Sequence, residues 1–270
     1  MAEQRSVGKK ILIGVGGFLG VLVLIYVIVT QILYQSLVVP TESMQRTVMV
    51  GDRILADRVS YREEELPERG EIIIFRYPGD RDQVEPAIEQ RYMDRCVAVS
   101  GDMVEVRGHV AYVNGVEESF PPEGEKPSVV RKMDAVESRT FPRGRGFHYA
   151  DWGPMRVPKR GDVIQLNDTS FIEWQTFIQR EGHTAVRQGE RILVDGVGVQ
   201  SYRVERNYVF GLGDNRSNSE DSRFWGFIPV ENIIARPVMV YMSMNVETDR
   251  RTGERKSSGI RWGRIGKEIE

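Results

Sequence analysis

The sequence predicts a mainly β domain preceded by a single membrane-spanning helix. Alternating apolar and polar residues are interrupted by Asn114-Gly115 and Asp195-Gly196, two dipeptides that favour the tight turns of β-hairpins. Short runs rich in β-branched residues, such as Glu71–Arg76, indicate further strands. Near the N-terminus, Ile11–Val29 runs for 19 residues without a charged side chain. These observations predict strands for the body of the chain and one long apolar helix before it.

The charge-free run is long enough to cross a bilayer, because a transmembrane helix needs about 20 predominantly apolar residues. Arg5, Lys9 and Lys10 precede the run, and the positive-inside rule therefore places residues 1–10 in the cytoplasm. A cleaved secretory signal is the alternative, but the apolar core of such a signal spans only about 7–15 residues, and no clear small-x-small cleavage site follows the run in this chain. We expect an anchor at residues 11–34 in the plasma (inner) membrane and an extracytoplasmic, or periplasmic, domain after it.

The folded domain is expected to span residues 35–245. Its strands are expected at Arg53–Val59, Glu71–Arg76, Tyr92–Val99, Arg191–Val194, Val197–Val204 and Tyr208–Leu212. Ser170–Glu181 is the best candidate for a soluble helix. A β-rich insertion is expected roughly at residues 106–203, and residues 246–270 are expected to form a polar tail.

Three apolar side chains stand out in this polar tail, namely Ile260, Trp262 and Ile265. We expect them either to touch the membrane interface or to close back on the β domain. Scattered exposed apolar residues are the alternative, since such residues are common on protein surfaces.

Composition excludes several classes of function. The net charge of −2 over 270 residues provides no broad basic field, which argues against a nucleic-acid partner. Cys96 is the only cysteine, so neither an intrachain disulfide nor a zinc quartet is possible. The three histidines, His109, His148 and His183, lack the spacing of metal ligands. We therefore expect no metal and no cofactor.

Four stretches together resemble the type I (leader) signal peptidases, membrane-anchored serine endopeptidases that remove signal peptides from exported proteins. They are residues 40–52 (PTESMQRTVMVGD), 69–75 (RGEIIIF), 92–102 (YMDRCVAVSGD) and 213–229 (GDNRSNSEDSRFWGFIP). The last stretch is very specific, and the four follow one another in the order of the family. The resemblance implies an antiparallel two-sheet catalytic domain with a β-rich insertion. It also implies two partners, the lipid bilayer and the signal peptides of exported preproteins.

The resemblance assigns roles to individual residues. Ser43 matches the nucleophile, and Met44 matches the neighbour that helps to line the substrate groove. Thr41 matches the hydroxyl that stabilises the oxyanion, and Ser219 resembles the hydroxyl that orients the general base. Four further residues resemble the charged scaffold beneath the site: Asp214, Arg216, Asp221 and Arg223.

Asp94 stands where the family places its general-base lysine. A serine hydroxyl needs a neighbouring base to take its proton, and burial can raise a carboxyl pKa from its usual value of about 3.9. Aspartate is shorter than lysine by about three bonds, which leaves roughly 2–3 Å to bridge on an unchanged backbone. Asp94 shares its strand face with Tyr92 and Cys96. His109, the only histidine close to it in sequence, is the alternative base.

These observations leave more than one function open. In the first, the chain is a signal peptidase I-type serine endopeptidase with Ser43 as nucleophile and Asp94 or another group as base. In the second, it is a catalytically impaired homologue that binds extended signal peptides without efficient cleavage. A structural membrane anchor with an incidental β domain is a third interpretation, but it leaves Ser43 and the stretch Asp214–Trp225 unexplained.

Overall fold

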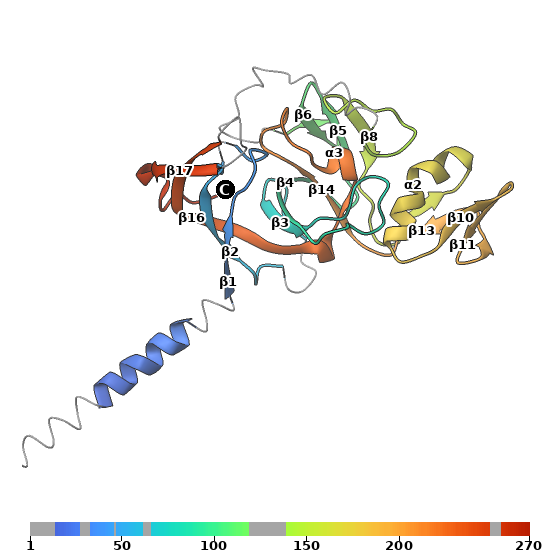
Figure 1. Cartoon of the computed structure of the whole chain (residues 1–270). Helices are drawn as coiled ribbons and strands as arrows, with labels where there is room; N and C mark the ends of the chain where they lie inside the picture. Colours follow the sequence, from blue (N-terminus) through green and yellow to red (C-terminus); the bar gives the residue numbers. More distant parts are fainter. Residues whose placement is uncertain (1–13, 28–32, 46, 62–65, 119–138, 249–254) are drawn as a thin grey trace, which may run out of the picture.

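The computed structural model describes residues 14–27, 33–45, 47–61, 66–118, 139–248 and 255–270. Residues 14–27 are helical and precede the folded body (Figure 1). The predicted anchor at residues 11–34 thus lies partly outside the described residues. Within the described ranges, no helix combines the length and the apolar character that crossing a membrane requires.

The body is built on one antiparallel sheet of eight strands, in the order β1-β2-β16-β3-β4-β14-β15 with β17 paired to β16. Its strands are β1 (Tyr34–Val38), β2 (Asp52–Asp57), β3 (Ile72–Arg76), β4 (Arg91–Val99), β14 (Tyr208–Leu212), β15 (Ile228–Pro229), β16 (Ile233–Thr248) and β17 (Arg255–Ile260). The long strand β16 pairs with β3 near its start and with β2 further on, and bulges interrupt both ladders. Such bulges bend a strand, so β16 joins two halves of the sheet. The predicted mainly β, antiparallel fold is confirmed.

The insertion adds smaller sheets and one helix. One sheet has the order β7-β6-β5-β8, a second is β10-β11-β12, and β9 pairs with β13. The elements are β5 (Met103–Arg107), β6 (Val110–Val113), β7 (Val116–Glu117), β8 (Trp152–Arg156), β9 (Val163–Gln165), α2 (Asp168–Arg180), β10 (Ala185–Gln188), β11 (Arg191–Val194), β12 (Val197–Gly198) and β13 (Ser201–Arg203). Both predicted hairpin turns are present, and Asn114, Gly115, Asp195 and Gly196 all have positive φ.

One cluster of buried apolar residues underlies the loop between β1 and β2. It contains Val39, Met44 and Val48 of that loop, together with residues of β2, β3 and β16. The loop is therefore anchored from below at three points. Because β1 and β2 are paired along their length, both ends of the loop are held as well.

The described residues of the predicted polar tail, 246–248 and 255–270, are folded. Residues 246–248 end β16, β17 pairs with β16, and η3 (Trp262–Arg264) follows. Ile269 is 8% exposed and belongs to the cluster beneath the β1–β2 loop. Ile260, Trp262 and Ile265 remain exposed on this segment. The segment thus returns to the β domain, while contact of its three exposed side chains with a membrane stays a prediction.

Candidate active site

Ser43 lies in the β1–β2 loop between an exposed and a buried neighbour. The loop leaves β1 through Pro40 and turns at residues 41–45, where the amide of Gln45 donates to the carbonyl of Glu42. Met44 is 1% exposed and packs in the core. Burial of Met44 fixes the direction of the chain, so that the partly exposed Ser43 is held at the surface.

Thr41 lies beside Ser43. Thr41 Oγ1 and Ser43 Oγ are 3.1 Å apart, and either hydroxyl can donate the hydrogen bond. The two hydroxyls that the sequence assigns to the nucleophile and to the oxyanion donor therefore lie side by side, while their catalytic roles stay a prediction.

The segment after β14 is hydrogen-bonded to the Ser43 loop. The amide of Asn215 donates to the carbonyl of Ser43 at 2.8 Å, and Asn215 Nδ2 donates to the carbonyl of Glu42 at 3.0 Å. A Cβ at Gly213 would lie 2.1 Å from Ser219 Oγ and 2.7 Å from the carbonyl oxygen of Ser43. Only glycine fits there, and Ser219 and Ser43 therefore lie close together around Gly213.

Asp94 is buried in the sheet behind this point. It lies on β4, between β3 and β14, and is 1% exposed. A Cβ at Gly211 of β14 would lie 2.9 Å from the Cβ of Asp94, so the carboxyl group packs against bare backbone. Within the described part of the chain, neither carboxyl oxygen of Asp94 has a hydrogen-bond partner. The structure thus places Asp94 behind the site without a hydrogen bond to Ser43 or Ser219.

Burial raises the pKa of Asp94 well above its usual range. The negative charge of Asp221 adds to the rise, and the positive charge of Arg223 opposes it. Burial penalises the charged form of an acid, so the neutral carboxyl group persists to a higher pH than in an exposed aspartate. Its carboxylate form is correspondingly the stronger base.

Two buried ion pairs form the scaffold beneath the site. Arg95 Nε and Nη2 donate to both carboxylate oxygens of Asp214 at 2.8 and 2.7 Å. Arg223 Nε and Nη2 donate to the two oxygens of Asp221, each at 2.8 Å, and Arg223 Nη2 also donates to the carbonyl of Arg216. Bidentate pairs of this kind fix direction as well as distance. They therefore hold the segment from Asp214 to Arg223 in one conformation.

Sequence reasoning missed the role of Arg95. The alternation of β4 correctly directs it away from the face of Asp94, and there it pairs with Asp214. Thr47 was also missed, although its Oγ1 donates to Asp214 Oδ2 at 2.5 Å and so joins the Ser43 loop to the same ion pair. The sequence did contain a signal for this role, because Arg95 directly follows Asp94 on a buried strand. A buried arginine needs a carboxylate partner.

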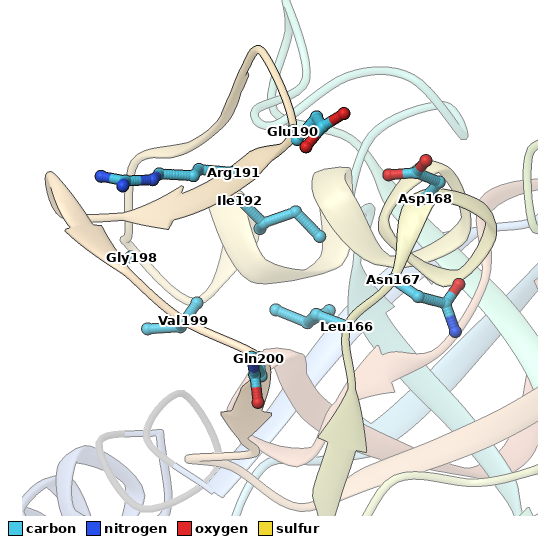
Figure 2. A pocket seen from close by; sticks show the side chains of 9 residues that line it. All are labelled: Leu166, Asn167, Asp168, Glu190, Arg191, Ile192, Gly198, Val199 and Gln200. Carbon is cyan, nitrogen blue, oxygen red and sulfur yellow. The ribbon is translucent and has the colours of Figure 1, made fainter.

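A groove opens in front of Ser43. It has a volume of about 410 Å³ and is lined by Pro40, Thr41, Glu42, Ser43, Val50, Tyr92, Asn218, Glu220, Val246 and Arg255. Tyr92 lies on the same face of β4 as the buried Asp94, two residues before it. Asp94 therefore lies just beyond the groove along this strand. A second pocket, of about 720 Å³, lies in the insertion between the start of α2 and the β11–β12 hairpin (Figure 2). Its lining includes none of the predicted site residues.

The alternative base, His109, lies elsewhere. It sits at the turn between β5 and β6 with a φ of 69°, and its ring centroid is 5.2 Å from that of Tyr149. Burial lowers the pKa of His109. His109 does not belong to the lining of the groove, so the structure does not bring it to Ser43.

Comparison with known proteins decides the family. The family described as signal peptidase, peptidase S26, matches residues 12–242 of this chain. The chain belongs to the S26 signal peptidase family. This confirms the resemblance carried by the four sequence stretches, and it supports a serine endopeptidase, a hydrolase, that acts on signal peptides.

Relatives within the S26 family are similar over most of their length. The signal peptidase I of Aquifex aeolicus is 29% identical over 236 residues, covering 83% of this chain and 82% of that protein. The signal peptidase I of Helicobacter pylori strain J99 is 24% identical over 276 residues, covering 92% and 90%. A crystal structure of a signal peptidase I from Enterococcus faecalis V583 is 22% identical, covers 64% of this chain and 97% of that one, and has a TM-score of 0.29.

Proposed function

We propose that this chain is a membrane-anchored signal peptidase in which Ser43 attacks the scissile carbonyl of signal peptides. The observation that carries the proposal is the hydroxyl pair of Ser43 and Thr41, 3.1 Å apart at the mouth of the groove. Membership of the S26 family supports the same chemistry. No metal or cofactor takes part in the proposed reaction.

The peptide lies extended in the groove between Tyr92 and the loop of Ser43. Attack by Ser43 Oγ converts the carbonyl oxygen into an oxyanion, which accepts hydrogen bonds from the Thr41 hydroxyl and the Ser43 amide. A preorganised donor of this kind contributes about 3–4 kcal/mol to transition-state stabilisation. Met44 supports the groove from below, because its burial fixes the position of Ser43.

The proton of Ser43 passes to the carboxylate of Asp94, directed by Ser219. Asp94 has no hydrogen bond to Ser43 at rest, so the transfer requires a bridging water or a shift of the site around the bound peptide. The raised pKa helps, since the carboxylate is a stronger base than in an exposed aspartate. The short side chain of Asp94 opposes the proton transfer, because it does not reach Ser43. We therefore propose slow cleavage.

A second candidate function is binding of signal peptides without efficient cleavage. The burial of Asp94 with no hydrogen-bond partner among the described residues favours it, because such a carboxyl group is poorly placed to exchange a proton with Ser43. The groove and its hydrogen-bonded walls would serve binding equally well. The two functions differ only in turnover.

The anchor at residues 11–34 places this groove near the membrane. Arg5, Lys9 and Lys10 hold the N-terminus in the cytoplasm, and the domain then faces the extracytoplasmic side. Strand β1 begins at Tyr34, the last residue of this anchor, and leads directly into the Ser43 loop. Signal peptides embedded in the bilayer would thus reach the groove with a short extended segment.

The test uses the purified full-length chain, a preprotein with a small-x-small cleavage site, and the Ser43→Ala variant. Mass spectrometry of the products and preprotein binding are measured together. Cleavage after the small-x-small motif that disappears in Ser43→Ala supports the peptidase. Binding without cleavage in both proteins supports the second function. Neither cleavage nor binding would contradict both.

A further inference from the structure

The C-terminal segment donates three arginine side chains to the Ser43 loop. Each guanidinium hydrogen-bonds a main-chain carbonyl, and the three carbonyls lie on both sides of Ser43. The pairs are Arg255 with Pro40 at 3.0 Å, Arg264 with Thr47 at 3.1 Å, and Arg261 with Val50 at 2.5 Å. Loop carbonyls that form no ladder hydrogen bond are thus satisfied by side chains from a segment more than 200 residues away in the sequence.

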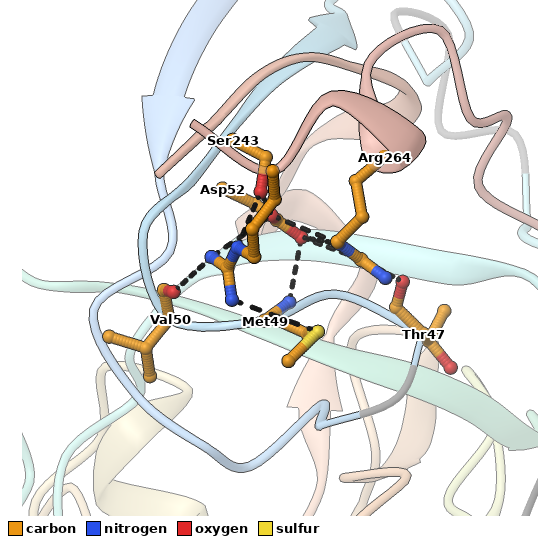
Figure 3. Close-up of polar contacts among 7 residues, drawn as sticks. Thr47, Met49, Val50, Asp52, Ser243 and Arg264 are labelled. Carbon is orange, nitrogen blue, oxygen red and sulfur yellow. Dashed lines mark hydrogen bonds and ion pairs between the residues drawn. The ribbon is translucent and has the colours of Figure 1, made fainter. Parts of the chain in front are cut away.

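Asp52 fixes two of these arginines. It is fully buried where the loop enters β2, and it accepts hydrogen bonds from Arg264 and from Ser243 Oγ of β16 (Figure 3). Arg261 Nη2 lies 3.5 Å from the same carboxylate. Burial alone raises the pKa of Asp52, but the hydrogen bonds from Arg264, Ser243 and Met49 outweigh it and lower the pKa. Asp52 therefore remains an anion and holds both guanidinium groups.

Close packing leaves this contact no freedom. Gly51 has a φ of 90°, and a Cβ there would lie 2.3 Å from the carbonyl oxygen of Met244 and 3.2 Å from Arg261 Nη2. The same segment contributes Ile269 to the core cluster that contains Met44, the residue next to Ser43. The loop, β16 and the C-terminal segment thus meet through close packing at Gly51 and through the ion pairs of Asp52.

We propose that residues 255–270 position Ser43 for attack, with Arg255, Arg261 and Arg264 as positioning residues. The proposal rests on the proposed role of Ser43 as nucleophile. A planar guanidinium presents five N–H donors in a fixed fork, which lets Arg264 bind Asp52 and the Thr47 carbonyl simultaneously. A lysine ammonium keeps the charge beside Asp52 but cannot span both acceptors.

The experiment compares the full-length chain with Arg264→Lys and Arg264→Ala. Three quantities are measured: the rate at which a fluorophosphonate labels Ser43, the Kd of a fluorescent signal peptide, and the melting temperature. Arg236→Lys is the matched control, since Arg236 of β16 pairs with Glu71 at 2.9 Å and has no hydrogen bond or ion pair with the loop among the described residues. Ser43→Ala shows that labelling is specific.

Arg264→Lys is expected to label about tenfold more slowly, because a displacement of about 1 Å at a reacting atom can cost up to 10²-fold in rate. Its Kd and melting temperature should stay close to those of the unaltered chain, since the charge beside Asp52 is retained. Arg264→Ala should lose both labelling and stability, and the Arg236→Lys control should change neither. Slow labelling at unchanged Kd is a result that a merely structural arginine would not produce.

Two results overturn the positioning role and leave the proposed function standing. In one, Arg264→Lys labels at the unaltered rate. In the other, labelling falls only in proportion to melting temperature across both Arg264 variants. If Arg264→Lys does not fold, Arg255→Ala decides, because exposed Arg255 has no contact with Asp52 among the described hydrogen bonds; an unaltered labelling rate there overturns the proposal. Absence of Ser43 labelling and of peptide binding in the unaltered chain would remove both proposals together.

Discussion

Asp94 is expected to make the stability of the domain depend on pH. In the unfolded chain its carboxyl group titrates near the usual value of about 3.9, whereas burial raises its pKa in the folded protein. The folded state therefore keeps a proton that the unfolded state has released, and stability falls as the pH rises through this interval. Asp94→Asn cannot ionise and should be more stable than the unaltered chain at pH 8 by roughly 1.4 kcal/mol or more, because it avoids the cost of deprotonating a buried carboxyl group.

Urea unfolding at pH 5 and pH 8 measures this difference. The advantage of Asp94→Asn should shrink at the lower pH, because the cost of deprotonating the buried carboxyl group falls as the pH falls. Glu89→Gln is the control, because Glu89 is exposed on the segment just before β4. Equal stability of Asp94→Asn and the unaltered chain at both values would mean that the buried carboxyl group carries no penalty.

Substitution of Thr41 tests whether its hydroxyl takes part in the reaction. Thr41→Ala removes a hydroxyl that lies 3.1 Å from Ser43 Oγ, and loss of one oxyanion donor costs about 10²–10³-fold in rate. Thr41→Ser retains the hydroxyl and should keep most of the activity. Labelling of Ser43 by a fluorophosphonate, followed by mass spectrometry, measures both variants. Equal rates in Thr41→Ala and Thr41→Ser would exclude the hydroxyl from the reaction.

Between elements, the pair of Arg95 and Asp214 joins β4 to the segment after β14. Arg95→Ala leaves Asp214 buried without its bidentate partner and should destabilise the protein by about 3–5 kcal/mol. Arg95→Met combined with Asp214→Leu removes both charges and should cost less than the single change. Urea unfolding compares the two. A double variant less stable than Arg95→Ala would show that the ion pair itself, rather than the orphaned charge, governs stability here.

Local patterns predicted the elements that local residues determine. Both hairpin turns were predicted because Asn-Gly and Asp-Gly tolerate the positive φ that such turns need. The helix predicted at Ser170–Glu181 begins two residues earlier, at Asp168, since Asn167 caps it by accepting hydrogen bonds from two amides of its first turn. The spacing of apolar residues cannot indicate that Asp168 and Thr169 are helical, because both are polar.

Long-range pairing could not be predicted. Strand β17 reads RKSSGI and is exposed throughout, so it has no alternation, and only its ladder with β16 makes it a strand. Ile269 looks like an isolated apolar residue of a polar tail, although it belongs to the same core cluster as Met44. The four stretches predicted which residues surround Ser43, and the roles of these residues stay a prediction. The contacts of Arg261 and Arg264 with Asp52 depend on a return of the chain that no local pattern indicates.

For the whole molecule, the expected topology is an N-terminus inside and the β domain outside. Arg5, Lys9 and Lys10 before the apolar run are the basis of this prediction. Protease added to intact spheroplasts should digest the domain and leave a short membrane-embedded fragment. A domain protected until the membrane is lysed would show the opposite orientation.

We expect Ser43 to be a competent nucleophile and Asp94 to limit turnover. Lysine at position 94 is longer by about three bonds and has a pKa that burial lowers toward neutrality, so it should reach Ser43 and Ser219 from the same strand position. A positioned general base contributes about 10²–10⁴-fold to rate.

The decisive measurement is cleavage of one preprotein by the membrane-inserted full-length chain, by Asp94→Lys, and by Asp94→Lys combined with Ser43→Ala. We expect slow cleavage by the unaltered chain, at least about tenfold faster cleavage by Asp94→Lys, and none by the double variant. Equal or lower activity in a folded Asp94→Lys protein would contradict the claim that Asp94 limits turnover.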